Sequence, residues 1–159
     1  EFVPFFQKPK TYEEVKEIVR ICEDNNLEIT GSYFQRKPAE LQDIIDYCTD
    51  TKKEINPSML FRTYDEIEKI DDLCRDKNIK LYPTMYKRPP EEVKNIIDLA
   101  TSHGLEVKGS FFRKNDDKFV KIIEKCDELG IKPSGSIFKR TPKEIEDIYN
   151  IYMYLSYYR

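Results

Sequence analysis

Four cysteines and one histidine are the residues of this 159-residue sequence best suited to bind a metal or react covalently. A zinc site requires ligands that converge on one point. The cysteines instead recur at one position of a repeating pattern: Cys22, Cys48, Cys74 and Cys126. Adjacent packed helices lie about 8–10 Å apart, whereas a disulfide requires Cα atoms within about 7 Å. We therefore expect four reduced, buried thiols, no metal, no cofactor and a cytoplasmic location.

The sequence offers no recognisable grouping of catalytic side chains. His103 comes in the last turn of an expected helix, just before Gly104, where a cation suits the helix dipole. It joins no Cys–His or Ser–His constellation, and no glycine-rich phosphate loop is present. We therefore predict a protein that is not an enzyme.

A column of basic residues is the most regular polar feature. One basic residue recurs at a constant spacing, and three members of this column directly follow another basic residue. The candidate binding residues are Arg36, Arg62, Arg88, Lys114 and Arg140, together with Lys87, Arg113 and Lys139. Along an array of repeats they would form a ladder, which could contact the phosphates of a nucleic acid at regular steps.

The same column also has a structural interpretation. Each arginine lies four residues before a glutamate, a spacing that allows an ion pair at the corner between two helices: Arg36 with Glu40, Arg62 with Glu66, Arg88 with Glu92, and Arg140 with Glu144. The net charge of −3, from 27 basic and 30 acidic residues, is not the positive excess of a nucleic-acid-binding chain. A protein or peptide partner is the first expectation, and nucleic acid is the alternative.

These side chains belong to a repeating unit of constant length. The first apolar residue of each expected long helix recurs without slippage, always at the same spacing: Val15, Leu41, Ile67, Val93, Phe119 and Ile145. Apolar residues follow three, four and seven positions later, with isoleucine at the first of these places in every unit, which predicts one buried stripe on an α-helix. Asp71 interrupts the stripe between Ile45 and Ile97. Because an unpaired buried carboxylate is costly, we expect Asp71 to be solvated at the rim of the core.

The second half of each unit predicts a short helical turn. A Ser or Thr that we interpret as its N-cap precedes an apolar pair, as in Ser110 before Phe111-Phe112. A strand is the alternative, because residues 105–107 alternate in polarity, but Pro57, Pro83 and Pro133 argue against a parallel ladder. The fold class that we predict is all-α, a right-handed α-solenoid of long-helix and short-helix repeats, with a helix-plus-strand solenoid as the alternative.

The array is expected to form a single domain over residues 1–159. Repeats are predicted at about 11–36, 37–62, 63–88, 89–114 and 115–140, followed by a terminal helix over 141–159. Residues 1–10 resemble a remnant repeat, and the start at Glu1 indicates a fragment of a longer protein. No apolar run approaches the ~20 residues of a membrane span, so no membrane association is expected.

The terminal helix has few charges and five tyrosines in residues 148–158. It could close the array with its tyrosine hydroxyls facing water. It could equally be a docking surface that pairs with further repeats or with a second copy, since large exposed apolar patches mark interfaces.

In outline, the long helix, short helix and proline near a helix start resemble the repeats of mitochondrial transcription termination factors and of transcription-activator-like effectors. That resemblance implies a helical superhelix that binds nucleic acid through a basic concave face. Both families use longer repeats, and no residue of this chain is matched to either. The predicted function therefore remains a non-enzymatic binding scaffold that recognises its partner along an extended surface.

Overall fold

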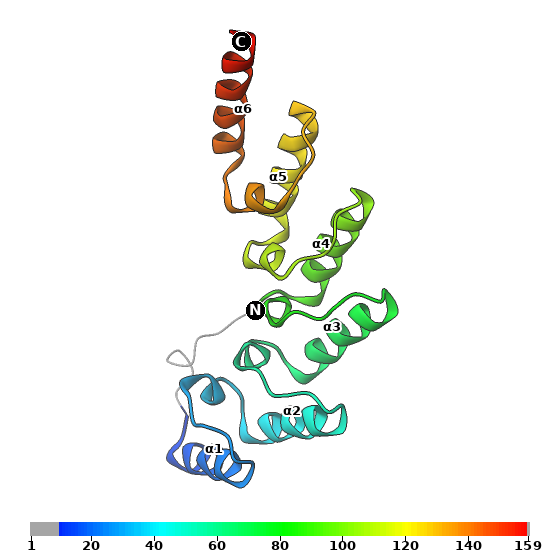
Figure 1. The fold of residues 1–159 in the computed structure, drawn as a ribbon. Helices are drawn as coiled ribbons and strands as arrows, with labels where there is room; N and C mark the ends of the chain where they lie inside the picture. Colours follow the sequence, from blue (N-terminus) through cyan, green and yellow to red (C-terminus); the bar gives the residue numbers. More distant parts are fainter. Residues whose placement is uncertain (1–9, 159) are drawn as a thin grey trace. The chain divides into compact units, whose positions relative to one another are not determined.

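The computed structural model describes residues 10–158, and within them every regular element is helical (Figure 1). The long α-helices are α1 (Tyr12–Asp24), α2 (Pro38–Asp50), α3 (Tyr64–Asp76), α4 (Pro90–Ser102), α5 (Asp116–Leu129) and α6 (Pro142–Tyr157). Short 3₁₀ helices precede the last five: η2 (Gly31–Gln35), η3 (Pro57–Phe61), η4 (Pro83–Lys87), η5 (Gly109–Arg113) and η6 (Gly135–Lys139). Successive long helices begin at the constant spacing that the sequence predicts. The alternative of a strand in each unit is wrong for the described residues.

The chain divides into two compact units, residues 1–89 and 90–159. The first holds α1–α3 with η2–η4, and the second holds α4–α6 with η5 and η6. Residues 1–9, which contain most of the expected remnant repeat, lie outside the described part of the chain. The single domain over residues 1–159 stays a prediction.

The helix starts follow the capping chemistry of the sequence. Thr11, Thr63 and Thr141 each close a capping box with the glutamate three residues later, and the Asn115 side chain accepts from the Lys118 amide. Proline takes the first position of α2, α4 and α6, where no amide hydrogen is needed. At the end of α5, Gly130 adopts the left-handed conformation, with φ of 68°, that favours glycine. These local signals explain why each long helix begins at the same position of its repeat.

The expected N-caps of the short helices are wrong. Each short helix begins at the glycine or proline that precedes this Ser or Thr, so the Ser or Thr is its second residue rather than its cap. The residues in the cap position are Thr30, Asn56, Tyr82, Lys108 and Ser134, and only Asn56 accepts an amide hydrogen bond with its side chain. Proline suits this first position because it has no amide hydrogen, and an amide hydrogen there would have no partner within the helix.

The core of the first unit is the apolar stripe of its long helices. Ile18, Ile44 and Ile70 are fully buried, and the cysteine column lies beside them. The Cys48 thiol lies 3.7 Å from the Met59 sulfur, and the Cys74 thiol lies 3.4 Å from the Met85 sulfur. Each of these two long helices therefore packs its cysteine against the short helix that follows it.

The core of the second unit repeats this packing with aromatic rings. Ile96 and Ile122 are buried in the isoleucine column. Phe138 of η6 packs against both Phe111 of η5 and Phe119 of α5, with ring centroids 4.6 and 5.1 Å away, and the Phe111 and Phe119 rings are 5.0 Å from each other. The sixth isoleucine, Ile148, differs from the other five and is 49% exposed. Its predicted core position is wrong because no described element covers that face of α6.

Candidate functional site

The first two members of the basic column make structural contacts in the first unit. The Arg36 Nε donates to the Leu60 carbonyl at 2.9 Å, which ties η2 to η3. Arg62 is buried, and its guanidinium lies 3.3 Å from Glu66. Arg36 is half-buried and Arg62 is buried, so both side chains contribute contacts to the fold.

The other members of the column are more open. Arg88 and Lys114 are half-buried, whereas Arg140 is exposed and lies 3.7 Å from Glu144. The preceding residues Lys87, Arg113 and Lys139 are all exposed. The expected Arg–Glu pairing is thus present at residues 62–66 and 140–144 and replaced at Arg36 by a backbone contact.

Two glutamates of the expected ion pairs accept hydrogen bonds from the backbone of the next repeat. Glu40 accepts from the Tyr64 amide at 3.0 Å, and Glu92 accepts from the Asp116 amide at 3.4 Å. Both amides stand at the first position of the next long helix, where no intrahelical partner exists. In α2 and α4, which have no threonine N-cap, the glutamate thus forms a hydrogen bond to the first amide of the next long helix.

Asp71 is buried, so its expected solvated position at the rim is wrong. The Tyr47 and Tyr86 hydroxyls each donate to its carboxylate at 2.5 Å, and the Lys53 ammonium donates to the same oxygen as Tyr47. A fully partnered carboxylate is tolerated in a core, which explains its place in an isoleucine column.

The Asp71 cluster borders an open hollow of about 520 Å³ that Thr51, Cys74 and Arg75 also line. Burial, followed by the hydrogen bond to Asp71, raises the pKa of both Tyr47 and Tyr86. Both hydroxyls are therefore neutral donors over the physiological range. With its carboxylate saturated and Lys53 paired, the cluster has neither a free base nor an activated nucleophile, and we interpret it as structural.

All four cysteines are free and buried, which confirms the expected thiol column. Burial raises the pKa of the Cys74 thiol to about 11. Because the thiolate is the reactive form, we expect Ellman's reagent to modify none of the four at near-neutral pH, and all four after unfolding in guanidinium. Rapid modification of the native protein would contradict the buried column.

His103 follows the last residue of α4. Its Nδ1 lies 3.0 Å from the Leu99 carbonyl, and its Nε2 lies 3.1 Å from an Asp127 carboxylate oxygen. These two partners, Asp127 first, raise the pKa of His103. The histidine therefore links α4 to α5, and both contacts favour its protonated form.

Metal binding and membrane insertion find no support in residues 10–158. These residues contain no group of three or more side chains able to hold a metal ion. None of their helices combines the length and the apolar character needed to cross a bilayer.

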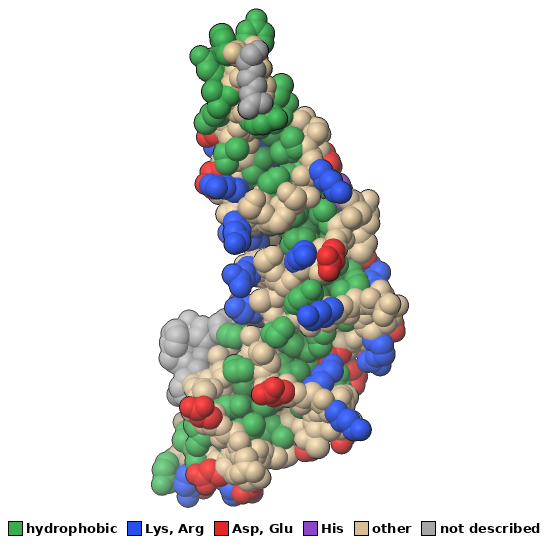
Figure 2. All heavy atoms as spheres, in the orientation of Figure 1, with side chains coloured by type: hydrophobic (Ala, Val, Ile, Leu, Met, Phe, Trp, Pro, Cys, Tyr) green, Lys and Arg blue, Asp and Glu red, His purple; other side chains and the backbone are tan. Residues whose placement is uncertain are grey.

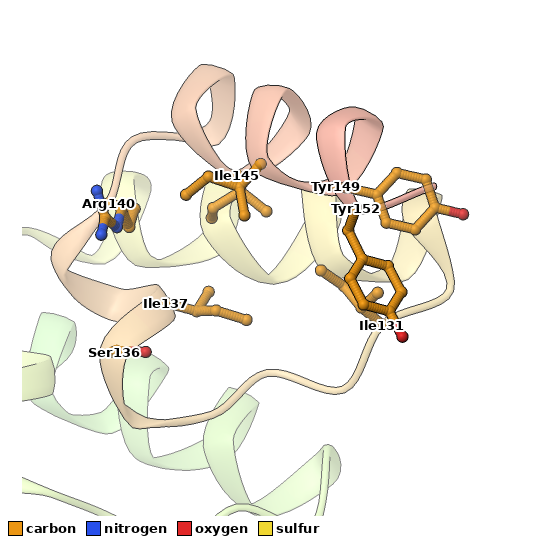
Figure 3. A pocket seen from close by; sticks show the side chains of 8 residues that line it. Ile131, Ser136, Ile137, Arg140, Ile145, Tyr149 and Tyr152 are labelled. Atoms are coloured by element: carbon orange, nitrogen blue, oxygen red, sulfur yellow. The ribbon is translucent and has the colours of Figure 1, made fainter. Parts of the chain in front are cut away.

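The outer face of α6 is the largest apolar feature of the second unit. Figure 2 shows hydrophobic side chains over this helix, and Ile151, Tyr152, Tyr154 and Leu155 are each more than half exposed. Beside it lies a hollow of about 400 Å³, lined by Ile131, Ser136, Ile137, Arg140, Ile145, Ile148, Tyr149 and Tyr152. Figure 3 shows Ile137 and Ile145 facing each other across the hollow, with Tyr149 and Tyr152 at one end and Arg140 at the other.

In the preceding repeat, the space that corresponds to this hollow is filled by a side chain. Ile137 and Ile145 occupy the same columns as Phe111 and Phe119 of the preceding repeat. Phe138, which is only 5% exposed, packs against both of those rings. The hollow beside α6 is therefore the counterpart of the site that Phe138 fills, and no described residue fills it.

The sequence singled out the tyrosine-rich helix but not this hollow. Ile137 and Ile145 look like any other core residues, because the pattern does not show which repeat lacks a covering neighbour. The sequence also contained a signal for the Asp71 cluster: Lys53 and Asp71 are charged residues of opposite sign that each interrupt an apolar column.

Comparison with known proteins identifies no relative. No protein-family model, no curated protein and no solved structure matches the chain significantly.

Proposed function

We propose that this protein is a non-enzymatic helical scaffold that recognises a partner protein through the hollow between η6 and α6. The partner contributes an aromatic side chain on a short helical segment, followed by a helix that lies along α6. The hollow carries this proposal, because within the same unit Phe138 fills the equivalent site. Its volume of about 400 Å³ also falls in the usual range of binding pockets.

The state of the basic column supports protein over nucleic acid as the main partner. Arg36 and Arg62 are engaged in the fold, and Arg140 pairs with Glu144. A continuous ladder over all repeats is therefore not available to a phosphate backbone. Apolar groups, by contrast, are concentrated on α6, where a docked helix would remove them from water.

The finer architecture belongs to the same proposal. From the equal spacing of the elements we infer a right-handed solenoid of long-helix and short-helix repeats, with contacts formed mostly between neighbouring repeats. Four free thiols favour a reducing compartment such as the cytoplasm.

A peptide of residues 131–150 is a suitable probe, since this segment covers the equivalent face of α5 within the chain. We expect the labelled peptide to bind the intact protein in a fluorescence anisotropy titration. The variant Ile148→Glu should abolish this binding, because a charge in the hollow would be desolvated by the peptide. Ile151→Glu is the matched control, since Ile151 is 61% exposed on the same helix but does not line the hollow.

A second control changes the probe. A peptide with Phe138→Ala should bind about tenfold more weakly or worse, because it loses its anchor. Equal binding by both peptides, or equal loss in both protein variants, would contradict docking in the hollow. Self-association that only Ile148→Glu prevents would identify a second copy of the chain as the partner.

A further inference from the structure

We propose that the short-helix edge of the second unit binds the phosphodiester backbone of a single-stranded nucleic acid. This site is separate from the hollow beside α6. It lies between η5 and η6, where two adjoining hollows of about 230 and 250 Å³ share Ser110 and Phe138 as lining residues. The basic side chains around them are Arg113, Lys114 and Lys139 in the first hollow and Lys108 and Lys132 in the second.

The charges of the second unit are segregated. Its two connecting segments, residues 105–115 and 131–141, hold six basic residues and one acidic residue. The acidic residue, Glu106, lies 3.5 Å from Lys108. Its long helices each carry more acidic than basic residues. The positive potential is therefore local to the edge, although the whole chain has a net charge of −3.

Ion pairing distinguishes Lys114, Lys132 and Lys139 of this edge from four lysines of the long helices. On the helices, carboxylates lie close to Lys94, Lys121, Lys125 and Lys143. Among the described residues, no carboxylate pairs with Lys114, Lys132 or Lys139. The acids that follow Lys114 are engaged elsewhere: Asp116 accepts from Asn95, and Asp117 lies 3.3 Å from Lys121. These lysines are left to attract an external anion.

The arrangement favours an extended single strand. The basic side chains come from two connecting segments and line two consecutive hollows. A single phosphate monoester would instead require basic side chains that converge on one point. Ser110 adds an exposed hydroxyl donor where the hollows meet. Phe138 is buried and offers no stacking surface, so binding should depend on the backbone and show little base preference.

The matching edges of the first unit carry fewer of these charges. Between η2 and η3, the positions of Lys108, Lys132, Arg113 and Lys139 hold Thr30, Glu54, Gln35 and Phe61. Between η3 and η4, they hold Asn56, Lys80, Phe61 and Lys87. Of the basic column, we therefore propose only the residues of the second unit as nucleic-acid-binding residues. Lys108 and Lys132, which lie outside that column, are added to them.

The test is the salt dependence of binding to a fluorescein-labelled oligothymidylate, followed by anisotropy over a series of KCl concentrations. Each phosphate contact adds about 0.7 to the slope of log K against log salt for a single strand. The double variant Lys114→Gln/Lys139→Gln should therefore lower the slope by about 1.4. The control Lys121→Gln/Lys143→Gln changes the net charge equally on the same unit and should leave the slope unchanged.

Circular dichroism would show that both variants remain folded. The proposal is overturned if the protein does not bind the oligonucleotide at low salt, or if the two double variants weaken binding equally. Displacement of the oligonucleotide by poly-glutamate at equal charge concentration would also overturn it, and would identify an acidic peptide as the ligand. Binding by the protein whose α6 hollow is blocked by Ile148→Glu should be normal.

Discussion

Replacing Asp71 by asparagine is expected to lower the free energy of unfolding by about 1.5–3 kcal/mol, the usual contribution of hydrogen bonds to a charged group. Asparagine keeps the size of the side chain, but its amide nitrogen cannot accept from a tyrosine hydroxyl. Either Tyr47 or Tyr86 then loses its acceptor, and Lys53 loses its counter-ion. Urea unfolding followed by circular dichroism would measure the change.

A compensating variant distinguishes loss of the network from loss of volume. Tyr47→Phe/Asp71→Ile/Tyr86→Phe removes the carboxylate and both hydroxyls together and restores the isoleucine found at residues 45 and 97. Replacing buried polar partners together by apolar residues is often neutral or stabilising, and the remaining Lys53 side chain is 31% exposed, so water can solvate its ammonium. This triple variant should therefore be more stable than Asp71→Asn. If Asp71→Asn has no effect, the carboxylate is solvated, as the sequence pattern suggested.

Truncating Ile96 to alanine is expected to cost about 2–5 kcal/mol, because the side chain is fully buried in the core of the second unit. The same substitution at Ile148 provides a comparison, because Ile148 occupies the equivalent position in the last helix. That side chain is 49% exposed, so Ile148→Ala should change the free energy of unfolding by less than about 0.5 kcal/mol. Equal costs at the two positions would show that α6 is covered in solution.

The sequence was a reliable guide to elements whose signals are local. Thr63 with Glu66 and Thr141 with Glu144 mark helix starts within four residues, and the structure has both capping boxes. The cysteine column was also predictable, because one apolar position per repeat implies one packing environment. Because the repeat has a constant length, a helix start recognised in one repeat predicts the helix start in every other repeat.

The sequence was a poor guide to contacts between repeats. Tyr47 and Lys53 reach Asp71 from 24 and 18 residues away, and Glu40 reaches the Tyr64 amide across the same sequence separation as Tyr47. The repeat pattern shows which residues occupy equivalent positions in different repeats. It does not show which non-equivalent residues of neighbouring repeats touch, and these contacts are of that kind. The hollow beside α6 escaped prediction for a related reason: it depends on a missing neighbour rather than on any residue present.

The most direct measurement of the central claim is an NMR titration of the ¹⁵N-labelled protein with the peptide of residues 131–150. If the hollow receives a helical segment with an aromatic anchor, amide shifts will concentrate in η6 and in the part of α6 from Ile145 to Tyr152 that lines the hollow. Ile137, Ile145, Ile148 and Tyr152 should shift most, and Phe138→Ala in the peptide should remove the effect. Shifts that are absent, or that map to the first unit and leave these four residues unchanged, would contradict the account.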